Sequence, residues 1–211
     1  MKFAVIGTGA VGGYYGALLA RSGFEVHFLL HSDFDHVREN GLLIESKEGD
    51  FVLESINAYG KPSDMPGCDV VIVALKTTQN HHLPGILTKV VKADGIVVLL
   101  QNGLGVEREI NELLPQAAVI GGLCFLCSNK VGPGHIRHLD YGSIRMGQFP
   151  RGQTAAGITD TLKFVADAFG KAGIPVHLTD NLGKARWEKL VWNMSYNGMS
   201  VVLNANTDQL M

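Results

Sequence analysis

Three polar side chains late in the chain have types and spacing that suit the reduction of a carbonyl compound. Lys189, Asn193 and Asn197 are spaced four residues apart, so on a helix they form one stripe. A lysine there could donate a proton to a ketone oxygen as negative charge develops, and partial burial would lower its pKa toward the working pH. The two asparagines could hold a hydroxyl or a carboxylate of the same compound. Spacing alone favours the alternative, a stripe that faces solvent.

The residues around this stripe are large and apolar, which is typical of a buried helix. They are Leu190, Val191, Trp192 and Met194. A polar stripe on a buried helix must find hydrogen-bond partners or face a wet cleft, because an unpaired buried polar group costs free energy. The stripe is therefore a candidate for the catalytic and substrate-binding face of a helix, with Lys189 as the candidate proton donor, and the solvent-facing stripe stays open beside it.

A glycine-rich turn near the start of the chain suits the binding of a dinucleotide. Its G-x-G-x-x-G pattern consists of Gly7, Thr8, Gly9, Ala10, Val11 and Gly12. In such a turn the first glycine permits the bend, the second lets backbone approach a pyrophosphate, and the third lets helix and strand pack closely. The following helix N-terminus offers unpaired N–H groups to the phosphates. A turn that serves packing alone is the alternative, but the motif lies between a predicted strand and a predicted helix, which favours the ligand site.

The end of the second predicted strand bears on which dinucleotide would bind. NAD sites usually place an acidic residue about 20 residues past the glycine motif, at this strand end. Here His31 and Ser32 come first, and the carboxylate of Asp33 follows two residues late. His31 and Ser32 could instead donate to a 2′-phosphate, with Arg38 nearby in sequence. Because a carboxylate would repel that phosphate, its displacement favours NADP(H).

Two further polar residues follow strands that are apolar on both faces. Lys76 comes after the predicted strand at 70–75, and Asn102 comes after the one at 96–100. Ligands of open α/β sheets bind beyond the carboxyl ends of the strands, so both residues are candidates to face the nicotinamide and the substrate. The alternatives are a lysine that extends its ammonium into water and an ordinary Asn-Gly turn.

The elements that would position these residues alternate between strand and helix patterns. Such alternation predicts an α/β fold of Rossmann type, with a mostly parallel sheet and helices on both faces. Pro84 is expected to interrupt or kink the helix that ends near residue 91, and turns are expected at 132–134 and 141–142. The predicted strands are residues 2–6, 26–30, 42–46, 51–53, 70–75, 96–100, parts of 118–149, and 174–178. The predicted helices are residues 10–21, 33–39, up to 91, 106–114, 156–172, and from 180 onward.

Composition excludes several classes of protein. The 211 residues are 46% hydrophobic and 18% charged, with a net charge of −2, which predicts a sizeable core and no basic footprint for nucleic acid. No apolar run approaches the ~20 residues that cross a bilayer. The first twenty residues could be read as a secretory leader, but their glycines interrupt the apolar run that a leader needs. We therefore expect a cytoplasmic protein that binds neither nucleic acid nor membrane.

Cysteine and histidine pairs give no sign of a metal site. Cys124 and Cys127 form a C-x-x-C pattern, but there is no second cysteine pair to complete a zinc site, and core packing is the expected role. His81 and His82 are adjacent, so on a helix they face different directions, and a solvated first turn is expected.

Four sequence blocks together resemble the ketopantoate reductases (2-dehydropantoate 2-reductases). They occur in the family's order across essentially the whole chain, and only the last is specific on its own. The blocks are VIGTGAVG at 5–12, LKTTQ at 75–79, QNG at 101–103, and ARWEKLVWN at 185–193 with Asn197-Gly198.

The resemblance implies NADPH-dependent reduction of 2-dehydropantoate to (R)-pantoate, on the route to pantothenate and coenzyme A. It implies that Lys189 is the catalytic lysine and that Asn193 and Asn197 bind substrate. It places Asn102 beside nicotinamide and substrate, Lys76 at the cofactor cleft, and the glycine motif at the pyrophosphate. It also divides the chain into a dinucleotide-binding domain at 1–180 and, at 181–211, the first helix of a helical substrate and dimerisation domain.

The sequence departs from the family in two respects. Family members commonly carry an arginine at the second strand end, where this chain has His31. A histidine lacks the bidentate fork of arginine, so a weaker preference for NADPH is expected. The family also continues into a mostly helical C-terminal domain, most of which is expected to be missing from the 211 residues. A homodimer is the assembly that the resemblance suggests.

Overall fold

A single mixed sheet organises the chain in the computed structural model, which describes residues 1–152, 154–205 and 209. Its strands follow the order β4-β3-β9-β8-β7-β6-β1-β2-β5, and β10 pairs with β9. Most neighbours run parallel, whereas the pairs β3–β4 and β8–β9 run antiparallel. The strands are β1 (Lys2–Ile6), β2 (Glu25–Leu29), β3 (Leu42–Ser46), β4 (Phe51–Leu53), β5 (Asn57–Tyr59), β6 (Cys68–Val73), β7 (Val91–Leu99), β8 (Ala118–Gly132), β9 (His135–Gln148) and β10 (Val176–Leu178). The predicted Rossmann-type sheet is confirmed.

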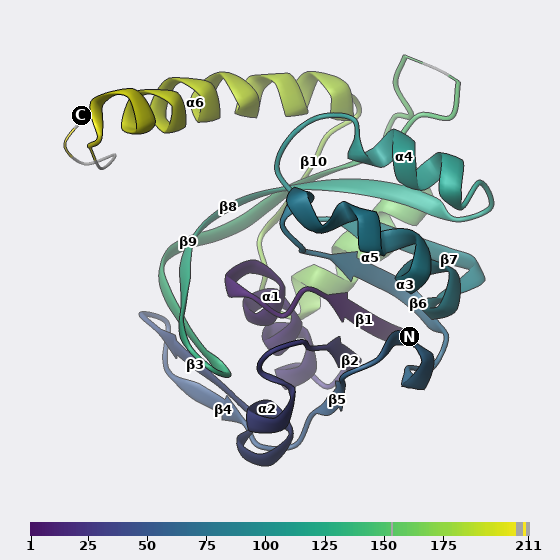
Figure 1. The fold of residues 1–211 in the computed structure, drawn as a ribbon. Coiled ribbons are helices and arrows are strands. Elements are labelled where there is room, and N and C mark those ends of the chain that lie inside the picture. The colour runs from purple at the N-terminus through teal and green to yellow at the C-terminus, as the bar shows by residue number, and fades with distance from the viewer. Residues whose placement is uncertain (153, 206–208, 210–211) are drawn as a thin grey trace.

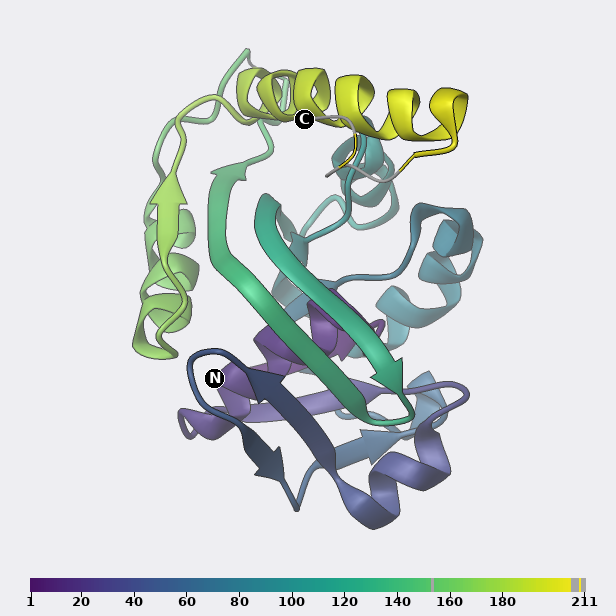
Figure 2. The ribbon, with the colours of Figure 1, turned by 90° about the vertical axis from the view of Figure 1, so that its left-hand side faces the viewer.

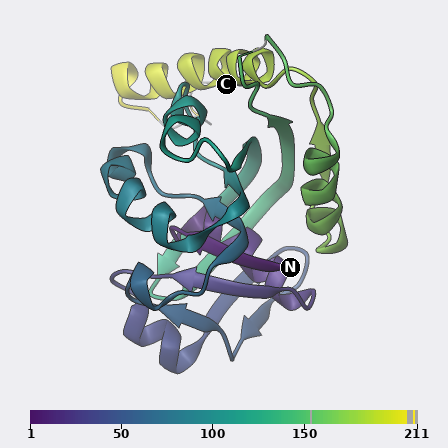
Figure 3. The ribbon, with the colours of Figure 1, turned by 90° about the vertical axis from the view of Figure 1, so that its right-hand side faces the viewer.

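Helices cover both faces of this sheet, as predicted. α1 and α5 pack on one face and α3 and α4 on the other, and these helices form the two large clusters of the core. Figures 2 and 3 show α5 and the α3–α4 pair on opposite sides of the sheet. The α-helices are α1 (Ala10–Arg21), α2 (Phe34–Asn40), α3 (Leu83–Val90), α4 (Val106–Leu113), α5 (Asp160–Lys171) and α6 (Leu182–Leu203), and the short 3₁₀ helices are η1 (Pro62–Asp64) and η2 (Thr77–His82).

The sheet curls so that the long β8–β9 hairpin and β3 wrap around α1 (Figure 1). The buried side chains of α1 therefore contact strands from both ends of the sheet. At Gly13 the Ile136 side chain of β9 packs directly against α1, because a Cβ there would lie 2.1 Å from Ile136 Cδ1. The central strands β1 and β6 are apolar on both faces because helices cover them on both sides.

Several details differ from the sequence predictions. Pro84 does not kink a helix; it lies in the first turn of α3, where its missing N–H costs little. Residues 141–142 do not form a turn between strands but an irregularity within β9, where Tyr141 has a φ of 63°. β5 was not predicted, because its three residues, Asn-Ala-Tyr, contain no β-branched residue and no apolar run.

α6 begins as predicted, but most of it extends away from the sheet (Figure 1). Asn181 caps its N-terminus by accepting a hydrogen bond from the backbone N–H of Lys184 at 2.9 Å. Leu182, Ala185 and Arg186 are buried. Large apolar side chains farther along are exposed, so the expectation of a buried helix is wrong for them within the described residues. They are Trp187, Val191, Trp192, Met194, Met199, Val201, Val202 and Leu203.

The division of the chain between residues 180 and 181 stays a prediction. Among the described residues, no helix combines the length and apolar character needed to cross a bilayer.

Candidate active site

The glycine turn lies between β1 and α1, as the sequence predicts. Gly7 has a φ of +98°, and a Cβ there would approach Leu75 N to 2.7 Å. At Gly12 a Cβ would lie 2.3 Å from Gly7 O, so the third glycine permits the close packing of strand and helix. Thr8 Oγ1 donates a hydrogen bond to Leu29 O at 3.1 Å. The turn is therefore fixed against the ends of both β2 and β6.

The face of this turn leaves room for a phosphate group. A Cβ on Gly9 would meet nothing within 4 Å, and Gly9 is the N-cap of α1 without a capping side chain. The first turn of α1 carries no acidic residue, and Ala10 and Val11 are half-buried. Free N–H groups at a helix N-terminus attract anions. The residues present thus fit the pyrophosphate of a dinucleotide.

The end of β2 presents His31 and Ser32 to solvent, and the carboxylate behind them is turned away. Asp33 is 7% exposed, and its oxygens accept hydrogen bonds from Ser32 Oγ at 3.0 Å and Gly134 N at 3.0 Å. Lys130 Nζ lies 2.6 Å from the same carboxylate. Burial raises the pKa of Asp33, but the hydrogen bonds from Lys130, Gly134 and Ser32 outweigh burial and hold the pKa below its ordinary value.

Arg38, the other residue considered for a 2′-phosphate, is engaged on its own helix. Its guanidinium lies 3.4 Å from Asp35 and 5.1 Å from the centre of the Phe34 ring.

Lys189 reaches the carboxyl edge of the sheet from α6. Its Nζ donates to Asn102 Oδ1 at 3.1 Å and to Cys124 O at 2.6 Å, and it lies 5.3 Å from the centre of the Phe125 ring. Burial lowers the pKa of Lys189, and the positive charge of Arg186 lowers it further. The structure thus brings together two predicted residues that are 87 positions apart.

Asn193 lies beside Lys189 and Asn102, whereas the predicted residues Asn197 and Lys76 do not. A small hollow is lined by Asn102, Gly103, Arg186, Lys189, Leu190 and Asn193. Asn197, one helical turn farther along α6, is exposed and does not line it. Lys76 is exposed at the N-cap of η2, after the strand that neighbours β7. Lys76 and Asn102 therefore follow adjacent parallel strands, as predicted, without a direct contact that would tie them together.

Arg186 is a residue of this site that sequence reasoning missed. Its guanidinium donates to Glu107 Oε1 at 2.8 Å, to Gln101 O at 2.8 Å and to Leu99 O at 3.4 Å. Arg186 and Glu107 are 6% and 5% exposed. This buried pair fastens the first turns of α6 to α4 and to the residue before Asn102. A charged residue at i−3 from Lys189, on the same helix face, was the available signal.

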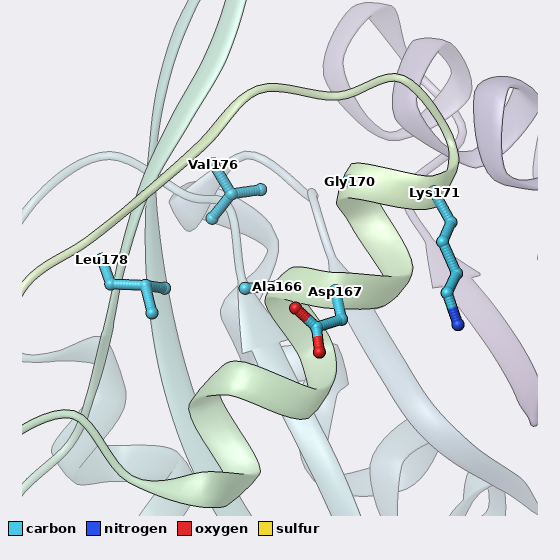
Figure 4. Close-up of a pocket in the computed structure, with 6 residues that line it drawn as sticks. All are labelled: Ala166, Asp167, Gly170, Lys171, Val176 and Leu178. Carbon is cyan, nitrogen blue, oxygen red and sulfur yellow. The ribbon is translucent and has the colours of Figure 1, made fainter.

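Another hollow, larger than the one beside Lys189, lies elsewhere, between α5 and β10. Figure 4 shows its lining, with Asp167 and Lys171 on α5 and Val176 and Leu178 on β10. None of the residues predicted for the site lines it.

The sequence of this chain is similar to those of known reductases. The family described as "Ketopantoate reductase PanE/ApbA" matches residues 3–151. This chain belongs to that family. A 2-dehydropantoate 2-reductase from Nostoc is 60% identical over the whole chain, which covers 66% of that protein. One from Halobacterium salinarum is 28% identical, also over the whole chain, with 68% of it covered.

Solved structures extend this similarity to the fold. The 2-dehydropantoate 2-reductase of Geobacter metallireducens matches with a TM-score of 0.90 and 41% identity over 97% of this chain and 66% of its own. A ternary structure of D-mandelate dehydrogenase with NADH and anilino(oxo)acetate matches with a TM-score of 0.85 and 25% identity, covering 98% of this chain and 65% of its own. The 211 residues thus correspond to about two thirds of the length of these family members.

Proposed function

We propose that this protein reduces 2-dehydropantoate to (R)-pantoate with NADPH, in the synthesis of pantothenate and coenzyme A. The observation that carries the proposal is the contact of Lys189 Nζ with Asn102 Oδ1, at the carboxyl edge of the sheet that also carries the glycine turn. Relatives named 2-dehydropantoate 2-reductase support the choice of substrate.

The residues of the turn and of the strand ends hold the cofactor in this proposal. N–H groups at the start of α1 bind the pyrophosphate where Gly9 leaves space. His31 and Ser32 face the adenosine ribose, and Lys76 and Asn102 face the nicotinamide end of the cleft. When bound, NADPH supplies the hydride, and the protein orients it and shapes the electrostatics around it.

Lys189 supplies the proton for the product hydroxyl. An ammonium has three N–H donors, and Asn102 Oδ1 and Cys124 O orient two of them. The third can be directed at the keto oxygen of the substrate. The lowered pKa of Lys189 eases proton transfer, because a proton donor works best with a pKa near the operating pH. Asn193 and Asn197 bind polar groups of the substrate along the same helix.

The decisive experiment follows NADPH absorbance with purified protein, with and without 2-dehydropantoate. The proposal predicts oxidation that depends on the keto acid. Binding of NADPH without any oxidation would instead identify a nucleotide-binding module that lacks turnover.

A second candidate is the reduction of another branched 2-keto acid. The fold match to a D-mandelate dehydrogenase bound to NADH and a 2-oxo compound favours it. Comparing kcat/KM across a panel of branched 2-keto acids separates the two candidates. A higher value for any other acid than for 2-dehydropantoate would favour the second. The cytoplasmic location and the homodimer are part of the proposal and rest on the sequence.

A further inference from the structure

The tip of the β8–β9 hairpin brings a lysine beside the residues that follow β2. Ser128 and Lys130 are two residues apart on β8, so their side chains point to the same face of the strand. Ser128 Oγ donates to Ala10 O in the first turn of α1 at 3.2 Å. Lys130 Nζ lies 2.6 Å from Asp33 Oδ2, just past the end of β2. One strand face thus spans from the phosphate turn to the tip of β2.

The cation of this pair is more accessible than the anion. The side chain of Lys130 is 35% exposed, whereas that of Asp33 is 9% exposed. Both oxygens of Asp33 already accept hydrogen bonds, from Ser32 Oγ and from the backbone N–H of Gly134. An ammonium has three N–H donors, and the contact with Asp33 uses one. The ammonium of Lys130 is therefore the more accessible charge of this ion pair beside His31 and Ser32.

We propose that Lys130 binds the 2′-phosphate of NADPH, together with His31 and Ser32, and sets the preference for NADPH over NADH. The inference rests on the proposed function, because it assumes that the cleft binds a dinucleotide. A phosphate monoester adds a charge of about −1.5 to −2 at pH 7. Lysine is a common phosphate-binding residue, whereas histidine lacks the bidentate fork with which arginine binds a phosphate. Lys130 thus binds the 2′-phosphate more strongly than His31 would bind it alone.

The test measures the dissociation constants of NADPH and NADH by titration calorimetry, since these cofactors differ only in the 2′-phosphate. Lys130→Gln is expected to weaken NADPH binding by about 10- to 100-fold, the usual loss for a hydrogen bond to a charged group. NADH binding is expected to stay within about twofold, because NADH lacks the phosphate. Lys130→Arg should retain most of the preference for NADPH over NADH. Lys47→Gln, which removes a lysine from the exposed Lys47–Asp140 pair, is the matched control and should change neither constant.

A second pair of variants separates ligand binding from folding, since Lys130→Gln leaves Asp33 without its cation. Asp33→Asn removes the carboxylate, and Asp33→Asn/Lys130→Gln differs from it only at residue 130. The double variant is expected to bind NADPH at least about tenfold more weakly than Asp33→Asn, with equal NADH binding. Equal loss for both cofactors, or no change in their ratio, would overturn the inference and leave the proposed function intact. Failure of the unchanged protein to bind either cofactor would overturn both.

Discussion

The two ends of the candidate cleft are built in different ways. The glycine turn at the cofactor end belongs to a strand, a turn and a helix that follow one another directly, and in the proposed function its backbone N–H groups hold the pyrophosphate. The substrate end depends on side chains that lie far apart in sequence, since Lys189 contacts Cys124 and Asn102 across 65 and 87 positions. Contiguous backbone sites can be identified from residue spacing alone, whereas assembled side-chain sites depend on how the helix is fastened to the sheet.

Removing the amine at the substrate end should produce the largest effect. Lys189→Ala is expected to lower kcat by about 10²- to 10⁴-fold, the usual contribution of one general acid. Binding of NADPH should be unchanged, because the glycine turn is untouched. Steady-state rates and cofactor titrations measure the two effects. Lys184→Ala, which removes an exposed lysine of the same helix, should leave kcat unaltered, and near-normal turnover by Lys189→Ala would exclude the lysine from the reaction.

Removing the buried ion pair that attaches α6 to α4 should have the next largest effect, a loss of stability. Arg186→Ala leaves the buried Glu107 carboxylate without its partner, which typically costs about 3–5 kcal/mol of unfolding free energy. Urea denaturation measures the loss. Arg186→Met/Glu107→Leu should recover most of it, because neither charge then remains buried.

The exposed ion pair of Arg145 and Glu188 is the matched control for the buried Arg186–Glu107 pair. Arg145→Ala should cost less than about 1 kcal/mol, as exposed pairs usually do. A similar loss for both arginines would contradict the special role of the buried pair.

Two glycines at the cofactor end should respond in opposite ways. Gly12→Ala places a Cβ 2.3 Å from Gly7 O, so stability should fall by about 1–3 kcal/mol, as in other overpacked sites. Gly9→Ala adds a methyl group where the structure leaves space, so stability should hold while NADPH affinity falls about tenfold. Thermal unfolding and calorimetric titration separate the two. Unchanged NADPH affinity in Gly9→Ala would mean that phosphate does not approach there.

The pH dependence should show the smallest effect. As a proton donor, Lys189 is active while protonated, so kcat/KM should fall as the pH rises through its pKa. Because burial lowers that pKa, the fall should begin below the ordinary lysine value of 10.5. Rates between pH 7 and 10.5 measure this alkaline limb. Persistence of the same limb in the residual activity of Lys189→Ala would assign the titration to another group.

More of the cofactor end than of the substrate end could be predicted from the sequence, because the cofactor end is contiguous in the chain and the substrate end is not. The bounds of β1 and α1 match the prediction, because strand, glycine turn and helix each have a local pattern. The stripe on α6 was predicted, but its partner Cys124 O is a backbone atom of a distant strand. Likewise Arg186, Glu107 and Lys130 act through tertiary contacts, which leave no periodic signal in the chain. The exposed apolar side of α6 was expected to be buried, since composition alone does not show what covers a helix.

A crystal structure with NADP⁺ and pantoate tests most directly the claim that the two ends form one cleft. The account predicts phosphate groups against the first turn of α1 and Lys189 Nζ within about 2.6–3.2 Å of the product hydroxyl. An empty glycine turn, or a Lys189 amine that points into water away from the nicotinamide, would contradict it.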